Sequence, residues 1–105
     1  MSPPYRVEFL PSAAREFGAL PRAVQLQLVA AVDGLAREPR PDGAALLSGT
    51  GSERIWRLRV GACRLLYQVT AEVLLVLVVR IADRREVYRS AEMKALLKRI
   101  RQARK

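Results

Sequence analysis

The stretch RIWRLRVGACRLLYQVTAEVLLVLVVRI, residues 54–81, decides the fold of this chain. Apolar residues largely alternate with charged or polar ones over 54–60 and again over 64–70, which predicts two strands. Gly61 and Ala62 lie between these runs and predict a tight turn, and residues 73–81 are apolar on both faces, as in a central strand. The three runs therefore predict an antiparallel meander.

The residues before this stretch predict a strand and two helices. Residues 5–10 alternate as a strand, and Ser12 is the expected N-cap of a short helix. A second helix is expected over about 20–38, and residues 40–51 predict a loop or a short edge strand. The apolar spacing of the second helix indicates one buried stripe, formed by Val24, Leu28, Val32 and Leu35.

The residues after the meander predict a short last strand over 84–89 and a basic amphipathic helix over 90–105. The expected fold class is α+β. An N-terminal strand and an α-hairpin pack on an antiparallel sheet of three to five strands, and the C-terminal basic helix follows. We expect residues 1–105 to form a single domain with its core at about 5–89. We expect the α-hairpin to cover one face of the sheet and the other face to be exposed, because it carries Arg57, Arg59 and Arg64.

The composition excludes several classes of site. The chain has 105 residues, a formal net charge of +9, no histidine and one cysteine. Ser-His-Asp triads, zinc proteases and paired-histidine ribonuclease sites all need imidazole, and Cys63 alone cannot form an internal disulfide. Cys63 is expected to be a buried, inert thiol and Trp56 to lie in the core under the helix pair. The sequence indicates no metal site and no cofactor.

The positive charge is concentrated in one half of the chain. Residues 1–53 carry 5 basic and 6 acidic side chains, whereas residues 54–105 carry 14 basic and 4 acidic ones. The basic residues are 16 arginines and 3 lysines, and an arginine fork fits a phosphate bidentately. This distribution indicates a polyanionic partner. No apolar run approaches the ~20 residues of a membrane span, and no signal core is evident, so a cytoplasmic protein is expected.

A cluster of arginines with one tyrosine is expected on the exposed face of the sheet. Arg57 and Arg59 are two residues apart on one strand, and Arg64 opens the strand that pairs with it. Arg84 and Tyr88 follow the central strand. Guanidinium groups suit the charge of a phosphorane formed by 2′-hydroxyl attack on RNA, whereas a tyrosine with a pKa near 10 is a poor base. Such a site needs a substrate that something else holds in a reactive geometry.

The block RLRVGACRLLYQV at 57–69, followed by DRREVY at 83–88, closely resembles the RelE branch of the RelE/ParE toxin superfamily. The resemblance also includes YRV at 5–7, AAR at 13–15 and the helix pair, and it spans about residues 5–89. It implies the toxin of a type II toxin–antitoxin pair, which enters the ribosomal A site and cuts mRNA by 2′-hydroxyl attack without a metal.

The resemblance also assigns roles to particular residues. It implies catalytic roles for Arg57, Arg64, Arg84 and Tyr88, and RNA contacts for Arg54, Arg59, Arg85, Arg89, Lys94 and Lys98. The chain departs from the family pattern at two positions: Ile55 stands where some members have a lysine, and Asp83 stands where many members have a histidine or a lysine. These departures leave the general base unassigned.

The implied partners are an acidic antitoxin, in an assembly such as a heterotetramer, and the ribosome with its RNA and mRNA. The helix over 90–105 is equally suited to contact ribosomal RNA, to fold onto the toxin or to be displaced by an antitoxin segment. Two alternatives remain: a ParE-like inhibitor of DNA gyrase without nuclease activity, and a relic that only binds antitoxin or RNA. The Arg64, Arg84 and Tyr88 set favours the nuclease.

Overall fold

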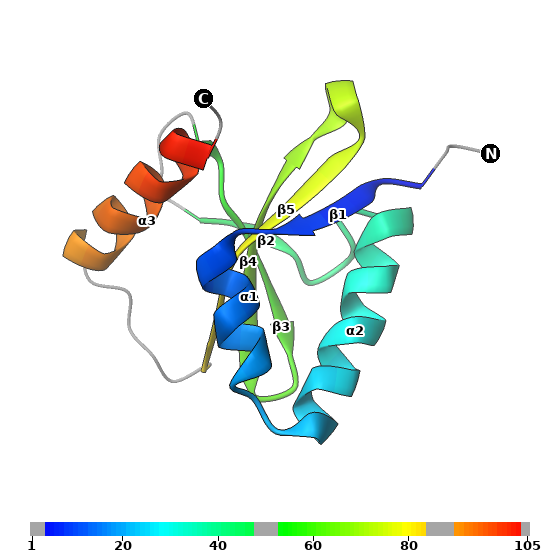
Figure 1. Cartoon of the computed structure of the whole chain (residues 1–105). Helices are drawn as coiled ribbons and strands as arrows, with labels where there is room; N and C mark the ends of the chain where they lie inside the picture. Colours follow the sequence, from blue (N-terminus) through cyan, green and yellow to red (C-terminus); the bar gives the residue numbers. More distant parts are fainter. Residues whose placement is uncertain (1–3, 48–52, 84–89, 104–105) are drawn as a thin grey trace.

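The computed structural model describes residues 4–47, 53–83 and 90–103 of the chain. Side chains are described in these segments except at 83, 90–92 and 103. The strand expected over 84–89 lies outside the described residues. In chain order the elements are β1 (Arg6–Phe9), α1 (Pro11–Gly18), α2 (Arg22–Arg37), β2 (Ala45–Leu46), β3 (Trp56–Val60), β4 (Cys63–Thr70), the 3-10 turn η2 (Ala71–Val73), β5 (Leu75–Asp83) and α3 (Ser90–Ala103) (Figure 1).

The meander β3-β4-β5 is the centre of the sheet, as the sequence predicts. Both pairings are antiparallel, and Val60 pairs with Cys63 across the two-residue turn. Gly61, the first residue of that turn, has a φ of 58°, which glycine adopts without a steric penalty. The β4–β5 register shifts by one residue between Leu66 and Tyr67, so β5 carries a bulge at this point.

The expected α+β fold with a mostly antiparallel sheet of five strands is confirmed, and one of its pairings is parallel. Its order is β1-β5-β4-β3-β2, and β1 pairs with β5 in parallel, with Val7 opposite Val76 and Phe9 opposite Val78. β5 has β4 on one side, so its other edge is available to β1. Alternation in residues 5–10 predicts a strand but carries no signal for its partner or direction.

The two helices after β1 differ in how well the sequence places them. α1 begins at Pro11, with Leu10 at the N-cap, so the Ser12 cap is wrong. Proline fits the first helical position because its φ is already helical and its missing N–H would have no partner there. α2 confirms the predicted helix and stripe, with Leu28 and Leu35 fully buried.

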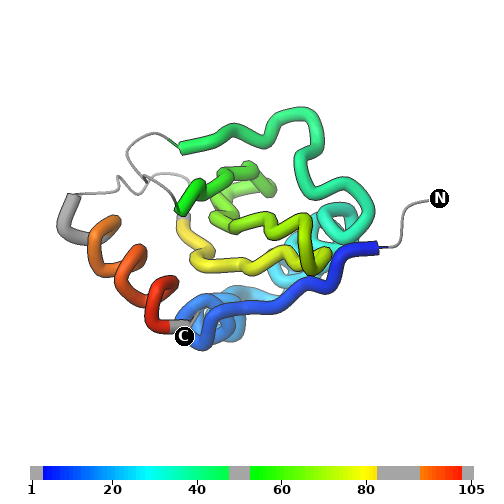
Figure 2. The backbone as a smooth tube through the Cα atoms, turned by 90° about the horizontal axis from the view of Figure 1, so that it is seen from above, coloured from blue at the N-terminus to red at the C-terminus, as the bar shows by residue number. Residues whose placement is uncertain are grey.

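α1 and α2 are placed differently on the sheet. α2 packs on the face where Phe9, Val78, Tyr67 and Trp56 form one row across four strands. α1 instead runs along β5 past the end of β1, where Glu16 accepts a hydrogen bond from the Ile81 N–H at 3.0 Å. The expected helical hairpin therefore covers one face mainly through α2, and Figures 1 and 2 show α3 on the opposite side of the sheet from α2.

The face opposite α2 is partly core, so the expectation of an exposed face is wrong. Leu66 on this face is fully buried, and Gln68 and Ala82 are nearly so. The apolar side of α3 joins the same core through Leu96, Leu97 and Ile100, with Met93 packed against it. The arginines on this face did not prevent burial, because α3 covers the apolar positions between and beside them. No helix in the described segments is long and apolar enough to cross a membrane.

Candidate functional site

Four arginines share the α3 side of the sheet, in two adjacent rows. In one row Arg57 of β3 and Arg80 of β5 flank Leu66 of β4. In the next row Arg59 of β3 lies directly opposite Arg64 of β4. Neighbouring strands are about 4.8 Å apart and same-face positions about 7 Å apart along a strand. We call these residues, Arg57, Arg59, Arg64 and Arg80, the arginine cluster.

The Arg59–Arg64 pair is the most highly charged point of the cluster. Directly opposed residues have Cβ atoms about 5 Å apart, and like charges placed so destabilise a sheet. The Arg64 side chain is half-buried, and its Nε atom is shielded from solvent and has no hydrogen-bond partner among the described residues. A buried donor without an acceptor costs free energy. Both features are relieved by an anion bound here.

Arg80 belongs to the cluster, although the sequence reasoning missed it. The run 73–81 reads as apolar on both faces, and Arg80 is its one basic residue. That lone charge in an otherwise apolar strand was the available signal. Arg80 Nε lies 3.4 Å from Glu16 Oε2, and both side chains are partly exposed. Arg80 is therefore the one cluster member with a carboxylate from another element beside it in the described part of the chain.

Arg54 lies apart from the cluster, ahead of β3. Its backbone has a φ of 48°, in the left-handed region that disfavours side chains other than glycine. With Arg40, Trp56 and Glu72 it lines a polar cavity of about 330 Å³. The Arg40 guanidinium lies over the Trp56 ring at 5.7 Å from its centre, so Trp56 is half-buried at the edge of the core. The RNA contact predicted at Arg54 stays a prediction.

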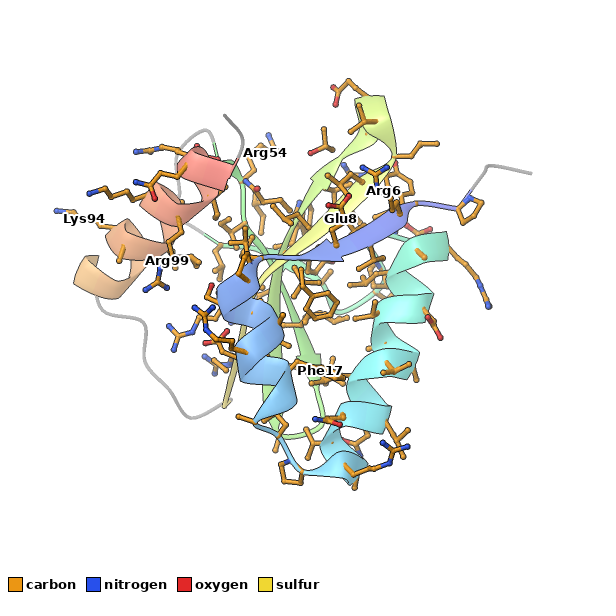
Figure 3. All side chains as sticks on the ribbon, viewed as in Figure 1. Arg6, Glu8, Phe17, Arg54, Lys94 and Arg99 are labelled. Atoms are coloured by element: carbon orange, nitrogen blue, oxygen red, sulfur yellow. The ribbon has the colours of Figure 1, made fainter. Side chains whose placement is uncertain are left out.

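The two lysines predicted to contact RNA are separated from the cluster. Lys94 and Lys98 are exposed on α3, whose opposite side is buried. Figure 3 shows Lys94 pointing away from the body of the protein, whereas Arg99 points toward α1. The structure therefore brings together Arg57, Arg59 and Arg64 but not Arg54, Lys94 and Lys98. The predicted residues Arg84, Arg85, Tyr88 and Arg89 lie outside the described residues.

Glu53 connects α3 to the sheet. Its buried carboxylate accepts a hydrogen bond from Arg101 Nε at 3.2 Å, and Gln68 Nε2 donates both to this carboxylate and to the Glu53 carbonyl. Arg101 is on α3 and Gln68 on β4, so one acidic residue ties the helix to the face that holds the cluster. No sequence pattern predicted this role, because Glu53 ends the near-neutral half of the chain.

Two positions singled out in the sequence are core residues. Cys63 is 5% exposed, which confirms a buried thiol. Ile55 is fully buried just before β3, and its carbonyl accepts a hydrogen bond from the Leu47 N–H at 2.8 Å. A residue packed in this way has no access to a substrate, so the position is structural in this chain. What the described residues offer is therefore a cationic surface of guanidinium groups rather than a complete acid–base pair.

Comparison with solved structures gives toxins of one superfamily. An archaeal RelE in complex with RelB from Pyrococcus horikoshii is 26% identical, with a TM-score of 0.69 over 79% of this chain and 98% of that chain. A RelBE2 toxin–antitoxin complex from Mycobacterium tuberculosis is 30% identical, with a TM-score of 0.67 over 77% of this chain and 99% of that one. A double arginine-to-alanine mutant of E. coli RelE in the free state is 26% identical, with a TM-score of 0.67 over 92% and 98%.

The family comparison covers most of the chain. No curated protein sequence matches it. The family model described as the ParE toxin of type II toxin–antitoxin systems, parDE, matches residues 7–88. This span includes the α-hairpin, the meander and the arginine cluster. The chain is therefore a type II toxin–antitoxin toxin and belongs to the RelE/ParE superfamily.

Proposed function

We propose that this toxin is an endoribonuclease that cuts mRNA in the ribosomal A site and so inhibits translation in the cytoplasm. The observation that carries the proposal is the Arg59–Arg64 pair, with the buried Arg64 Nε aimed at no described acceptor. Like charges directly opposed on a sheet are destabilising, a bound anion would offset this cost, and the scissile phosphate of RNA is such an anion. The RelE structures similar to this chain over 77–92% of its length support the same assignment.

The proposed reaction needs no covalent intermediate with the protein. The RNA 2′-oxygen attacks phosphorus, the P–O5′ bond breaks, and the products are a 2′,3′-cyclic phosphate and a 5′-hydroxyl. The 2′-hydroxyl loses its proton and the 5′-oxygen gains one. Arg57 and Arg64 stabilise the negative charge that develops on the phosphorane oxygens, because positioned guanidinium groups stabilise the transition state where charge develops.

The other predicted residues complete the proposed site. Arg84 acts on the scissile phosphate or leaving group and Tyr88 orients the base, as the family resemblance implies. Arg54, Arg59, Arg85, Arg89, Lys94 and Lys98 hold RNA. The chain has no histidine to act as a general acid or base, so the site alone is a weak catalyst. The ribosome therefore holds the RNA in the reactive geometry. An acidic antitoxin is the proposed protein partner, and the similar structures from P. horikoshii and M. tuberculosis are a RelE–RelB complex and a RelBE2 toxin–antitoxin complex.

A second candidate function is inhibition of DNA gyrase, because the matching family model is that of ParE. This function needs a protein-binding surface and no phosphate chemistry. The buried, unsatisfied Arg64 donor is an unfavourable feature in such a protein, since nothing in that function offsets it. The two candidates predict different lesions in the cell.

The test is inducible expression followed by mapping of mRNA 5′ ends and of DNA breaks. The nuclease predicts codon-phased cuts in mRNA, and these cuts are lost in Arg64→Ala. Arg22→Ala on α2, on the other side of the sheet, is the matched control and keeps them. Intact mRNA together with gyrase-linked DNA breaks refutes the proposal. With purified ribosomes, Arg64→Ala is expected to reduce the cleavage rate by about 10²-fold, the effect of losing ~3 kcal/mol of transition-state stabilisation.

A further inference from the structure

A cationic cavity lies at the junction of α1, β5 and α3, and it shares Arg80 with the arginine cluster. It is a cavity of about 260 Å³, lined among others by Ser12 and Glu16 of α1, Arg80 of β5 and Leu96 and Arg99 of α3. Its floor is apolar and buried, since Leu96 is 3% exposed. Its rim carries the two guanidinium groups. Because Leu96 and Arg99 belong to α3, the cavity is complete only while α3 lies on the sheet.

The charges around this cavity favour an anion. The Glu16 carboxylate is already engaged, since Oε1 accepts the Ile81 N–H at 3.0 Å and Oε2 lies 3.4 Å from Arg80 Nε. Arg99 makes no hydrogen bond or ion pair within the described parts of the chain, and Figure 3 shows it on the α1 side of α3. The cavity therefore has one more positive charge than negative charge.

The start of α1 adds to this preference. Ser12 is in the first turn of α1, and this turn contains no acidic residue and has no side-chain cap. Pro11 has no N–H, but the first-turn N–H groups that follow it lack intrahelical acceptors and carry a partial positive charge. A hydroxyl donor and two guanidinium groups lie in the same cavity. These are the donors that bind a tetrahedral oxyanion such as phosphate. The volume is several times the ~30 Å³ that one water occupies in the liquid, so a phosphate group with its nearest waters fits.

We propose that this cavity is a phosphate-binding site, that its ligand is a backbone phosphate of ribosomal RNA, and that the bound phosphate holds α3 on the sheet. The assignment of RNA as the source rests on the proposed function. A ligand that contacts both Arg80 and Arg99 binds the docked arrangement of α3 and not an undocked one. It therefore shifts the equilibrium toward docking by its differential affinity.

The first arm of the test uses inorganic phosphate and the full-length protein. Phosphate is expected to raise the urea midpoint and to slow amide exchange over 90–103, relative to chloride at equal ionic strength. Arg99→Gln is expected to weaken phosphate binding at least tenfold by calorimetry and to abolish both effects. Arg99 is exposed, so this variant keeps the fold. Arg22→Gln, which removes one exposed guanidinium on the other side of the sheet, is expected to behave as the wild type. Equal phosphate effects in Arg99→Gln and Arg22→Gln overturn the site.

The second arm identifies the source of the phosphate. In ribosome pelleting, Arg99→Gln is expected to weaken ribosome binding several-fold more than Arg22→Gln. Free phosphate is expected to compete with the ribosome for the wild-type protein. Equal ribosome binding by the two variants, with phosphate still bound in the first arm, overturns RNA as the source. Phosphate binding that depends on Arg99 in a protein that leaves cellular mRNA uncut supports the site while refuting the proposed nuclease, so the two failures are distinguishable.

Discussion

Replacing Tyr67 by phenylalanine removes one buried hydroxyl group at the centre of the sheet. The Tyr67 side chain is fully buried, and its hydroxyl donates a hydrogen bond of 2.7 Å to the Pro39 carbonyl, which follows α2. The bond therefore ties β4 to the segment that leads from α2 to β2. Because the ring stays in place, Tyr67→Phe leaves the packing intact, but the buried Pro39 carbonyl loses its hydrogen bond. The expected loss is about 1–3 kcal/mol of the free energy of unfolding at neutral pH.

The same hydroxyl makes stability depend on pH in a predictable direction. Burial raises the pKa of Tyr67 from 10.0 to about 12, and the nearby Arg40 charge offsets part of this rise. Between these values the unfolded chain loses the tyrosine proton while the folded chain keeps it, so the unfolded state is favoured as pH rises. The contribution is fully present below pH 10 and is lost as pH rises through about 12. Its size is on the order of 3 kcal/mol.

The assay is urea unfolding of the wild type, Tyr67→Phe and the control Tyr5→Phe, at a pH well below 10 and at several values up to 12. We expect the stability difference between wild type and Tyr67→Phe to shrink across this window, because only the wild type loses the tyrosine contribution. Tyr5 is half-buried at the start of the chain, and Tyr5→Phe is expected to follow the wild type. A constant difference across the window, or a Tyr67→Phe protein as stable as the wild type, refutes the reasoning.

Three further changes test the fold. Gly61→Ala is expected to lower the free energy of unfolding in urea by about 1–2 kcal/mol, because Gly61 has a φ of 58°. The new Cβ would meet the end of the Gln27 side chain, which can move away. An unchanged urea midpoint contradicts the left-handed conformation of Gly61 in this turn. Glu16→Ala is expected to cost about 1–3 kcal/mol through the lost acceptor for the Ile81 N–H, whereas Glu16→Gln keeps an acceptor and costs less than about 1; equal losses would show that the hydrogen bond does not matter. Ile100→Ala is expected to cost about 2–5 kcal/mol, since Ile100 is fully buried; a loss below about 0.5 kcal/mol would mean that α3 is not part of the core.

Sequence reasoning placed the elements whose signal is local. The turn at Gly61 and Ala62 fixes the β3–β4 register, and that register puts Arg59 opposite Arg64. The apolar stripe of α2 likewise follows from helical spacing alone. For the same reason the sequence alone groups the central residues of the proposed site, which are Arg57, Arg59 and Arg64.

The cluster's fourth member depended on packing between distant segments. Arg80 is 23 residues from Arg57 in the chain and joins its row only because β4 pairs with both β3 and β5 through the bulge after Leu66. The sequence pattern of residues 73–81 shows an apolar strand with one charge and does not reveal which face carries that charge. The contact of Arg80 with Glu16 also requires that α1 run along the edge of β5.

The sequence by itself determined the helices and strands, the hairpin register and the segregation of charge, because each depends on neighbours a few residues apart. Only the tertiary structure decided that β1 joins β5 in parallel and that α3 covers the face with the arginines. Strand partners and helix docking depend on which apolar surfaces remain uncovered once the local elements have formed. The periodicity of one segment does not predict which surface of another segment it will pack against. The physical consequence is a cationic face that is half core, with Leu66 buried beneath α3 and guanidinium groups beside it.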